Sequence, residues 1–401
     1  MERSALRSAV DLPCEPPSAR SIVVERPRPL RIAHVTEYYY PHLGGVCEHV
    51  HFFAREARRR GHHVDIITSS MRGTRAPERG EHVVQIGYSQ PIYANGSMAR
   101  ITVGLALRRR VREVLRRGGY DIVHVHSPLV PTLPLLAIDE AHCPTIGTFH
   151  TYFDHSRIYS HFPAYFQRRL DRLDAAIAVS PAAAEAHARH FRADWTIIPN
   201  GIDTESFTPQ APPPPDWTDD VPVILFLGRL DPRNGLATLL RAFRRVRERG
   251  YRSRLVVVGD GPLRAHYERA ALADPDITFV GSVLEGRPSY YAHSAIYACP
   301  TTKASFGITL LEAMACGTPV VCSDIFGFRE VVAHEREALL FPRDDHERLA
   351  DALIRLLDDP ALRARLGATG RVRALTYSWP RVADAILDVY ARVRGLAAVA
   401  P

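Results

Sequence analysis

Short apolar runs alternate with longer amphipathic stretches along most of the chain. The runs are rich in β-branched residues and have the length of strands, whereas the stretches between them repeat their apolar positions with helical spacing. In the first half, strands are predicted at 31–36, 63–68, 82–86, 121–126, 145–150, 175–180 and 196–199. Helices are predicted at 45–60 and 100–117, each followed by glycine, the residue expected just past a helix end. This alternation predicts βαβ units and a parallel sheet.

A proline-rich segment at 203–221, which contains four consecutive prolines, interrupts the pattern. Proline has no backbone donor and cannot join a central strand, so the segment indicates a domain boundary. The alternation then starts again, with strands predicted at 223–228, 254–259, 277–281, 295–300, 319–323 and 338–341, and helices near 235–249, 307–316, 345–358 and 380–397. We therefore predict an α/β protein of two facing, doubly wound Rossmann-like domains, with ligands in the cleft between them.

The length of 401 residues fits about two domains. The first 28 residues are rich in Pro, Arg and Ser and show no periodicity, which is typical of disorder. The predicted order is a disordered tail at 1–28, an N-terminal domain at 29–202, a linker at 203–221, a C-terminal domain at 222–378 and, at 379–401, a helix crossing back to the N-terminal domain.

Composition narrows the class of protein. Hydrophobic residues make up 46% and charged residues 24%, with no apolar run of membrane-spanning length and no secretory leader pattern, so we expect a cytoplasmic protein. The six cysteines form no C-x-x-C pair and the 19 histidines show no ligand spacing, so no metal is expected. The net charge of +7 either suits an anionic partner or reflects charged residues that only form a solvated surface. No aromatic stacking array supports nucleic-acid binding.

The segment 300–323 carries the strongest chemical signal. Gly307 lets the backbone approach a ligand where a helix begins, and the free N–H groups of that first turn bind anions or hydroxyls. Glu312 lies one and a half turns further on, where a carboxylate can accept two hydroxyl hydrogens, as from a ribose. The alternative is an ordinary solvent-facing glutamate.

Other strand ends carry further candidates. Arg229 leaves a buried strand in GRLDPRNG, where its guanidinium can hold a diphosphate. Gly259 and Gly261 form a turn that admits a nucleotide ring close to the backbone. Gly44 and Gly45 follow a strand and open a helix, an arrangement that cradles phosphate.

His150 ends a strand, where it either donates to a sugar hydroxyl or is structural. Asn95, Gly96, Ser97 and Arg100 form a polar loop before a helix rich in arginine. That helix carries Arg108, Arg109, Arg110, Arg112, Arg116 and Arg117. Such a helix is either a solvated face or a surface that docks on anionic lipid headgroups.

Taken together, these segments resemble glycosyltransferase family 4, and most closely its phosphatidylinositol mannosyltransferases. The resemblance spans residues 30 to 395. It is carried by PHLGGVCEHV (41–50), NGSMAR (95–100), DIVHVHSP (121–128), TIGTFHT (145–151), IIPNGID (197–203), LFLGRLDPRNG (225–235) and ASFGITLLEAMACGTPVVCSD (304–324).

The resemblance implies the two-domain GT-B fold and the retaining transfer of a mannose-like hexose. The donor it implies is a nucleotide diphosphate sugar, GDP-linked rather than UDP-linked, and the acceptor is lipid-linked or phosphorylated, at the inner membrane face. It implies no metal or cofactor. The leaving phosphate takes the acceptor proton in same-face attack, so no separate general base is required.

The resemblance also assigns roles to residues. His150, Arg229 and Glu312 are the implied catalytic set, contacting the transferred sugar, the diphosphate and the ribose. Donor contacts are further expected from Gly44, Gly45, Gly259, Gly261, Ser305, Phe306, Gly307, Ile308 and Thr309. Acceptor contacts are expected from Asn95, Arg100 and Thr151.

Three positions depart from the family pattern. Asn234 stands where the family has a lysine at the diphosphate, Ala304 where it has the first glutamate of E-x7-E, and Cys47 where it has an acceptor-side glutamine. The neighbours Arg233 and Lys303 are candidate substitutes. Losing such contacts typically costs a few kcal/mol.

These departures leave two alternatives to an active transferase. One is a non-catalytic relative that binds a nucleotide or glycan and acts as a partner protein. The other is a nucleotide-sugar epimerase of the same fold, although such enzymes carry additional acidic groups at the donor sugar and Ala304 counts against that function.

Overall fold

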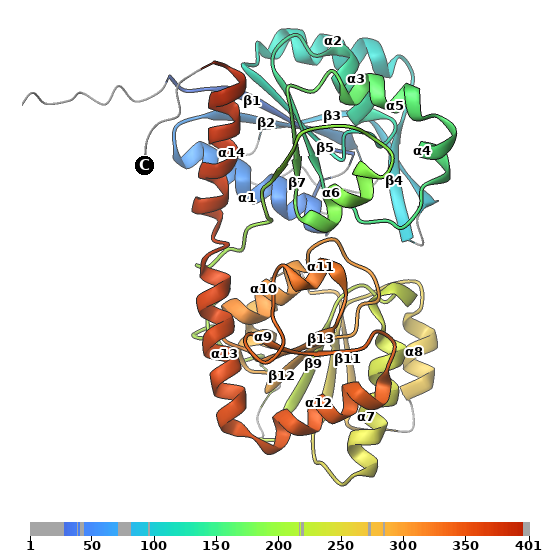
Figure 1. Ribbon diagram of the computed structural model, residues 1–401, viewed down its shortest axis with the longest axis vertical. Helices are drawn as coiled ribbons and strands as arrows, with labels where there is room; N and C mark the ends of the chain where they lie inside the picture. The colour runs from blue at the N-terminus through green and yellow to red at the C-terminus, as the bar shows by residue number, and fades with distance from the viewer. Residues whose placement is uncertain are drawn as a thin grey trace, which may run out of the picture.

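The structure is a computed structural model that describes residues 28–37, 39–40, 44–70, 82–94, 97–215, 217, 220–271, 274–283 and 285–395, without the side chains of 93–94 and 97–99. The predicted tail, apart from residue 28, and the candidate Asn95 lie outside the described residues. Two α/β domains lie one above the other and are joined along one side by a pair of long helices (Figure 1).

The N-terminal domain is built on a sheet whose described strands run in the order β4-β3-β2-β1-β5-β6-β7-β8. Only β3 and β4 pair antiparallel among these strands. The strands are β1 (Arg31–Val35), β2 (His63–Ser70), β3 (His82–Ala94), β4 (Ser97–Val103), β5 (Ile122–His126), β6 (Thr145–Phe149), β7 (Ala175–Ala178) and β8 (Trp195–Ile197). The central strands β5 and β6 are buried throughout, as expected for a parallel sheet covered on both faces.

Helices cover both faces of this sheet. They are α1 (Gly45–Arg59), α2 (Leu107–Gly118), α3 (Leu133–Glu140), α4 (Arg157–His161), α5 (Pro163–Leu170) and α6 (Pro181–Ala188). One core cluster joins the sheet to α1, and a second joins it to α2 and α3. The two faces of the sheet therefore pack into two separate hydrophobic cores.

The predicted helix at 100–117 is partly wrong. β4 continues to Val103 and pairs with β3, and α2 begins only at Leu107. The run Ile101-Thr102-Val103 is β-branched, with Thr102 buried between more exposed neighbours, so strand pairing prevails there. Ser97 and Arg100, predicted in a loop, lie on this strand.

The C-terminal domain contains a second parallel sheet, whose described strands run in the order β11-β10-β9-β12-β13-β14. They are β9 (Val223–Leu227), β10 (Arg254–Val258), β11 (Ile277–Gly281), β12 (Ile296–Cys299), β13 (Val320–Ser323) and β14 (Ala338–Phe341). The helical segments are η1 (Pro232–Asn234), α7 (Leu236–Glu248), α8 (Arg264–Ala271), α9 (Arg287–Ala292), α10 (Ile308–Ala315), α11 (Phe326–Arg329), α12 (His346–Asp358) and α13 (Pro360–Leu375). Helices α7 and α12 pack on one face, and α10 packs on the other.

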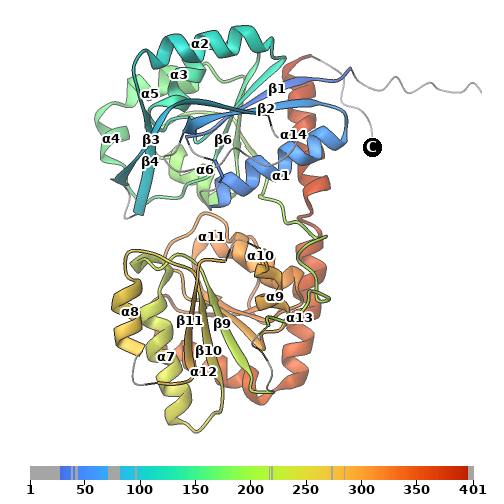
Figure 2. The same ribbon diagram turned by 180° about the vertical axis from the view of Figure 1, so that it is seen from behind.

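The last helix, α14 (Trp379–Val393), packs on the N-terminal domain beside α1 (Figures 1 and 2). Trp379 fills the space beside Gly201, where an added Cβ would lie 2.5 Å from the indole ring. Tyr390 donates or accepts a 2.6 Å hydrogen bond at His124 Nδ1 in the core of the sheet. The C-terminal segment is therefore part of the N-terminal core.

The two sheets meet through the segments that follow their strands. In the N-terminal domain these segments follow β1, β6 and β7, and in the C-terminal domain they follow β12. Gly45 lies against Ile308, Ser180 Oγ donates to the Ser305 carbonyl at 2.5 Å, and Lys303 pairs with Asp154. The strand order reverses beside β1 and beside β9, so each domain presents its switch point to this interface.

Candidate active site

Two helix N-termini meet where the two domains are in contact. Helix α1 begins after Gly44 and α10 after Gly307, and neither N-cap residue has a side chain to satisfy the first-turn N–H groups. A Cβ placed on Gly45 would lie 2.7 Å from Ile308 Cδ1, so the two helix ends are in contact. Both ends carry the positive pole of the helix dipole, which makes this interface suited to an anion.

The loop that carries Arg229 is held by the turn after β10. A Cβ on Gly259 would lie 1.9 Å from the carbonyl oxygen of Gly228, and one on Gly261 would lie 2.6 Å from that of Leu230. Gly259 also has a φ of +138°, a conformation that other residues rarely adopt. These glycines thus have a packing role: they let the Arg229 loop lie directly on the neighbouring turn.

Two arginines of this loop are available to a ligand. The guanidinium groups of Arg229 and Arg233 form no hydrogen bond or ion pair with any residue that the structure describes. The Nε of Arg233 is buried and lacks a partner within the same described set. The Arg233 carbonyl accepts from the Thr302 backbone N–H at 2.8 Å, which joins the loop to the segment leading into α10. An anion at the N-terminus of α10 would supply the acceptors that the Arg229 and Arg233 guanidinium groups lack.

Glu312 of α10 is enclosed by two polar side chains of α9, Arg287 and Tyr291. Its side chain is 1% exposed, so the alternative of a solvent-facing glutamate is wrong. Arg287 of α9 places Nη1 2.9 Å from Glu312 Oε1, and Tyr291 donates to Oε2 at 2.7 Å. The same guanidinium reaches Glu48 of the N-terminal domain, with Nη2 2.5 Å from Oε1. Glu312 is therefore the inner end of an ion-pair chain that joins the two domains.

Burial and neighbouring charges have opposite effects on the pKa values of the residues in this ion-pair chain. Burial raises the pKa of Glu312 to about 7, although Arg287 favours its charged form. Burial would lower the pKa of Arg287, but Glu312 and Glu48 raise it above its ordinary value. Arg287, which no sequence motif indicated, is the cation that stabilises the buried carboxylate of Glu312.

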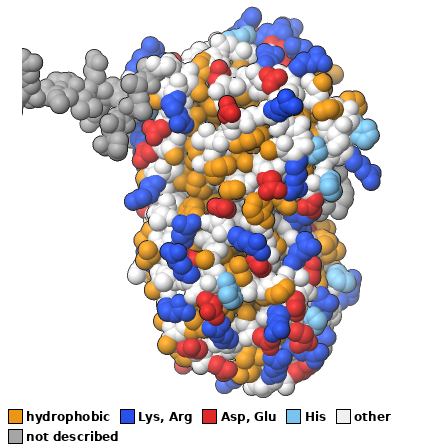
Figure 3. Space-filling view, viewed as in Figure 1, with side chains coloured by type: hydrophobic (Ala, Val, Ile, Leu, Met, Phe, Trp, Pro, Cys, Tyr) orange, Lys and Arg blue, Asp and Glu red, His pale blue; other side chains and the backbone are white. Residues whose placement is uncertain are grey.

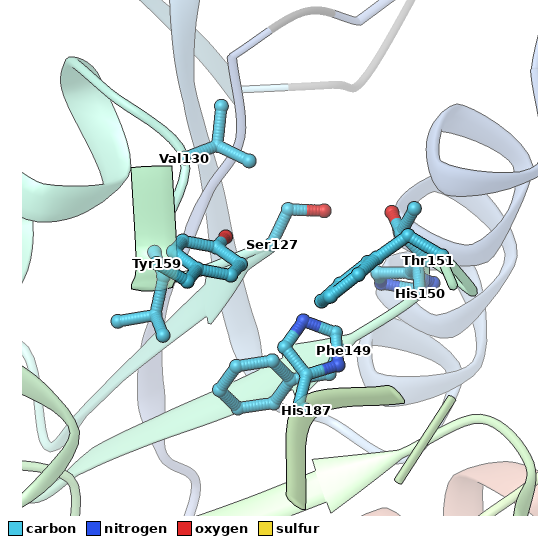
Figure 4. A pocket seen from close by; sticks show the side chains of 9 residues that line it. Ser127, Val130, Phe149, His150, Thr151, Tyr159 and His187 are labelled. Carbon is cyan, nitrogen blue, oxygen red and sulfur yellow. The ribbon is translucent and has the colours of Figure 1, made fainter. Parts of the chain in front are cut away.

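His150 lies at the end of a row of buried histidines. Its Nε2 is 3.0 Å from His126 Nδ1, and His126 Nε2 is 2.7 Å from His34 Nδ1. On the other side, His150 lines a cavity of about 50 Å³ together with Ser127 and Thr151 (Figure 4). Figure 4 shows the Ser127 and Thr151 hydroxyls directed toward one another across this hollow. A cavity of this size holds a few water-sized groups.

The acceptor-side candidates are divided between two places. Arg100 Nε donates to Ser89 Oγ at 2.6 Å, and both residues line an open cavity of about 520 Å³ with Tyr88 and Gln90. Thr151 instead borders the small cavity beside His150. The structure therefore places Thr151 beside His150 and leaves Arg100 in a separate hollow.

Comparison with known proteins identifies the family. The glycosyltransferase family 4 model matches residues 43–206 and the glycosyl transferases group 1 model matches 221–359. Phosphatidyl-myo-inositol mannosyltransferase of Mycolicibacterium smegmatis is 35% identical over 369 residues, covering 91% of this chain and 95% of the relative. D-inositol 3-phosphate glycosyltransferase of Xylanimonas cellulosilytica is 30% identical, covering 87% and 92%. The chain belongs to glycosyltransferase family 4.

Solved structures give the fold of this glycosyltransferase. A glycosyltransferase from Rickettsia africae superposes with a TM-score of 0.72 at 16% identity, covering 92% of this chain and 99% of that one. An Anabaena protein in complex with UDP and glucose superposes with a TM-score of 0.70 at 18% identity, covering 90% and 99%. The predicted GT-B fold is confirmed, and the chain is a glycosyltransferase. None of its described helices has the length and apolar character needed to span a bilayer.

At one position where this glycosyltransferase departs from its family, the side chain serves the loop itself. Asn234 Nδ2 donates to the Arg229 carbonyl at 2.7 Å, and its backbone N–H is capped by Asp231 at 3.2 Å. Asn234 therefore fixes the turn that presents Arg229 and adds no charge. Arg233, one residue earlier, brings the second cation into the same loop.

At Ala304 the transferase has a hollow of about 210 Å³ between its domains, lined by both of them. Lys303 lines it but pairs with Asp154 at 2.5 Å, so it is not a free cation. Asp324, at the end of β13, lines the same hollow and is held by Arg329 at 2.7 Å. Sequence reasoning did not select Asp154 or Asp324, although Asp324 directly follows a predicted strand.

Proposed function

We propose that this glycosyltransferase transfers a mannose-like hexose, with retention at the anomeric carbon, from a nucleotide diphosphate sugar to a phosphorylated, lipid-linked acceptor. The observation that carries the donor half is the contact between the N-termini of α1 and α10. Two glycine-capped helix ends meet there, next to a loop whose Arg229 and Arg233 have no partner among the described residues. A diphosphate supplies the charge that this arrangement lacks.

The proposed chemistry follows from this placement. Helix N–H groups and arginine side chains stabilise the diphosphate as it gains charge on leaving. The acceptor hydroxyl attacks from the face that the leaving group vacates, and its proton passes to the departing phosphate oxygen. The bond from the anomeric carbon to the phosphate oxygen breaks, and a bond to the acceptor oxygen forms. GDP is proposed over UDP from the family resemblance alone.

The hollow at Ala304 is proposed to receive the transferred sugar. Asp324 and the Lys303–Asp154 pair present acceptors and donors along its wall, where the family has a glutamate. We expect Asp324→Asn to lower kcat/KM for the donor sugar about tenfold while nucleotide binding is unchanged, because Asp324 faces the sugar. An equal loss of nucleotide affinity would place Asp324 elsewhere in the site.

The acceptor half rests on the second hollow and its rim. Arg100 supplies a cation within the cavity of about 520 Å³, as a phosphorylated headgroup requires. The neighbouring surface is apolar: Leu105 is 92%, Tyr88 58% and Val103 38% exposed. Helix α2 begins beside them, and Figure 3 shows Lys and Arg side chains gathered over it at the top of the N-terminal domain. An amphiphilic acceptor in an anionic membrane matches this combination.

A thermal-shift panel of GDP, UDP and their hexose conjugates tests the donor half. Binding stabilises the protein by about 2.7 kcal/mol at a hundredfold excess over Kd. We expect the GDP compounds to raise Tm and Arg229→Ala to abolish the shift. Arg244→Ala, an exposed arginine of α7, serves as the matched control and keeps the shift. No shift with any nucleotide would contradict the proposal.

Transfer assays with vesicle-bound phosphatidylinositol test the acceptor half. Replacing Arg109 and Arg110, both exposed on α2, by glutamate is expected to reduce binding to anionic vesicles and to lower turnover there. The paired replacement of the exposed α7 residues Arg241 and Arg244 is the control. Equal binding of the wild type to neutral and anionic vesicles would contradict the membrane contact.

A further inference from the structure

Histidines from three neighbouring strands form a continuous row inside the N-terminal domain. His34 lies on β1, His126 ends β5, and His150 directly follows β6. The ring contacts join His34 Nδ1 to His126 Nε2 at 2.7 Å and His126 Nδ1 to His150 Nε2 at 3.0 Å. His34 and His126 are at most 1% exposed, so water does not satisfy them. The row runs from the core of the sheet to the cavity that His150 lines.

All three rings are neutral at ordinary pH. Burial, together with His49 and Arg58, lowers the pKa of His34 to about 3. Burial and the neighbouring histidines hold the pKa values of His126 and His150 well below the usual 6.5. A neutral imidazole has one N–H donor and one acceptor nitrogen, so the two ring contacts must be directed the same way along the row.

The inner end of the row decides between the two directions. His34 Nε2 is buried and has no hydrogen-bond partner within the described part of the chain. If each ring donated inward, His34 would carry its proton on Nε2 and leave an N–H unpaired in the core, which costs about 1–3 kcal/mol. If each ring donates outward, that nitrogen has only a lone pair, and the nearby charge of Arg58 stabilises it. Orphaned N–H groups are the rarer case in protein interiors.

We propose that His34 and His126 are positioning residues that fix the tautomer of His150. His34 Nδ1–H donates to His126 Nε2, and His126 Nδ1–H donates to His150 Nε2. His150 therefore carries its own proton on Nδ1, where no described residue binds it, and presents that N–H as a donor to an oxygen of the transferred sugar or the leaving phosphate. This role rests on the proposed function, but the tautomer does not.

A metal ion is a less suitable occupant of the same residues. His34, His124 and His126 place potential ligand atoms within 4.8 Å of one another. However, His124 already uses both ring nitrogens, at 2.6 Å from Tyr390 and from Thr148, and His126 uses both of its own. A metal would have to break several of these contacts at a site without access to water. The hydrogen-bonded row accounts for the same geometry without that cost.

Nitrogen-15 NMR of histidine-labelled full-length protein tests the tautomer directly. Two other histidines calibrate the spectrum. His187 Nδ1 donates to the Ala183 carbonyl at 2.8 Å, and His62 Nδ1 accepts from the Leu30 backbone N–H at 3.1 Å, so they represent the two tautomers. We expect His150 to match His187. A His150 signal that matches His62 overturns the proposal, whatever reaction the enzyme catalyses.

Two variants test the row itself. His34→Phe keeps a ring in the core but removes the inner donor, so His150 is expected to populate both tautomers. His126→Phe removes the donor to His150, whereas His126→Asn places an amide N–H near the former Nδ1. An unchanged His150 spectrum in His34→Phe would show that the row does not set the tautomer.

Kinetics separates positioning from simple loss of structure. We expect His126→Phe to lower kcat at least tenfold while the thermal shift with nucleotide is retained, and His126→Asn to recover most of the rate. His293→Phe, a partly buried histidine bonded to the Ala211 carbonyl in the other domain, is the control. Equal rates in His126→Phe and the wild type would contradict the role of His150 in transfer and leave the NMR result to decide the tautomer.

Discussion

Removing Arg287 is expected to destabilise the protein far more than removing a surface arginine. Its guanidinium lies between two carboxylates, 2.9 Å from Glu312 and 2.5 Å from Glu48, and Glu312 is 1% exposed. Arg287→Met keeps much of the side-chain volume and removes the charge. Among the described residues, Tyr291 then remains as the hydrogen-bond donor to Glu312, and a neutral hydroxyl compensates a buried charge only in part.

Breaking a buried ion pair by removing one partner costs about 3–5 kcal/mol, because the other charge stays buried. We adopt that range for Arg287→Met at pH 7.5. Arg249→Met is the matched control: Arg249 pairs with Asp351 at 2.7 Å, but both side chains are more than 40% exposed, and such pairs contribute about 1 kcal/mol or less. Urea unfolding of the two variants gives the comparison.

The destabilisation by Arg287→Met is also expected to shrink as the pH falls. Burial already holds the pKa of Glu312 at about 7, above its unfolded value of 4.5. A carboxyl whose pKa is raised in the folded state favours folding below the unfolded pKa, and this contribution is lost as the pH rises through the folded value. Loss of Arg287 raises the folded pKa further, so the variant holds Glu312 protonated at pH 7.5, which accounts for about 1 kcal/mol of the penalty. At pH 5.5 the carboxyl is protonated in both proteins, and this part of the penalty disappears. Adding Glu312→Gln should remove the pH dependence. A cost below 1 kcal/mol at pH 7.5, or equal costs at both pH values, would refute this reasoning.

Three further outcomes are expected. Gly259→Ala should abolish or strongly weaken the nucleotide-induced rise in Tm, since its Cβ would lie 1.9 Å from a backbone oxygen. Gly250 also has a positive φ, +87°, but its Cβ would meet open space, so Gly250→Ala should keep the rise in Tm. Arg233→Ala should weaken nucleoside diphosphate binding at least tenfold in calorimetric titration; unchanged affinity would assign the diphosphate to Arg229 alone. His34→Phe should reduce the loss of unfolding free energy between pH 7 and 5.5 by about 1.3 kcal/mol. A histidine whose folded pKa is depressed stabilises the fold above pH 6.5 and loses this contribution as the pH falls. An unchanged pH dependence in urea unfolding would contradict the buried neutral ring.

Hydrophobic alternation was sufficient to predict most of the fold. The predicted strands at 223–228 and 254–259 correspond to β9 and β10 within one residue, because buried parallel strands are continuous apolar runs. The prediction failed at 100–103, where an arginine-rich amphipathic stretch masked the end of a strand. Pairing with β3 decides that segment, and such pairing is a long-range property that local periodicity does not contain.

Site residues could be predicted from the sequence where one short segment specifies both the local backbone structure and the groups that would bind a ligand. Gly307 and the start of α10 are an example, since a glycine between a strand and a helix specifies the helix end by itself. Arg287 and His126 were not predictable, because their significance comes from partners far away in the sequence. Glu48 lies 239 residues from Arg287, and His34 lies 92 residues from His126.

Two of the three departures from the family pattern, Asn234 and Ala304, have different physical consequences. Asn234 is bonded to the Arg229 carbonyl, so its loss would disturb the loop, and a lysine there would have to find another way to hold the turn. Ala304 only opens space, and the acidic Asp324 already lines that space. We therefore expect Arg233 to retain positive charge at the proposed diphosphate site, and Asp324, at a different strand end, to take over the proposed sugar contact. Donor-sugar selectivity, more than nucleotide affinity, is then the property in which this enzyme should differ from its relatives.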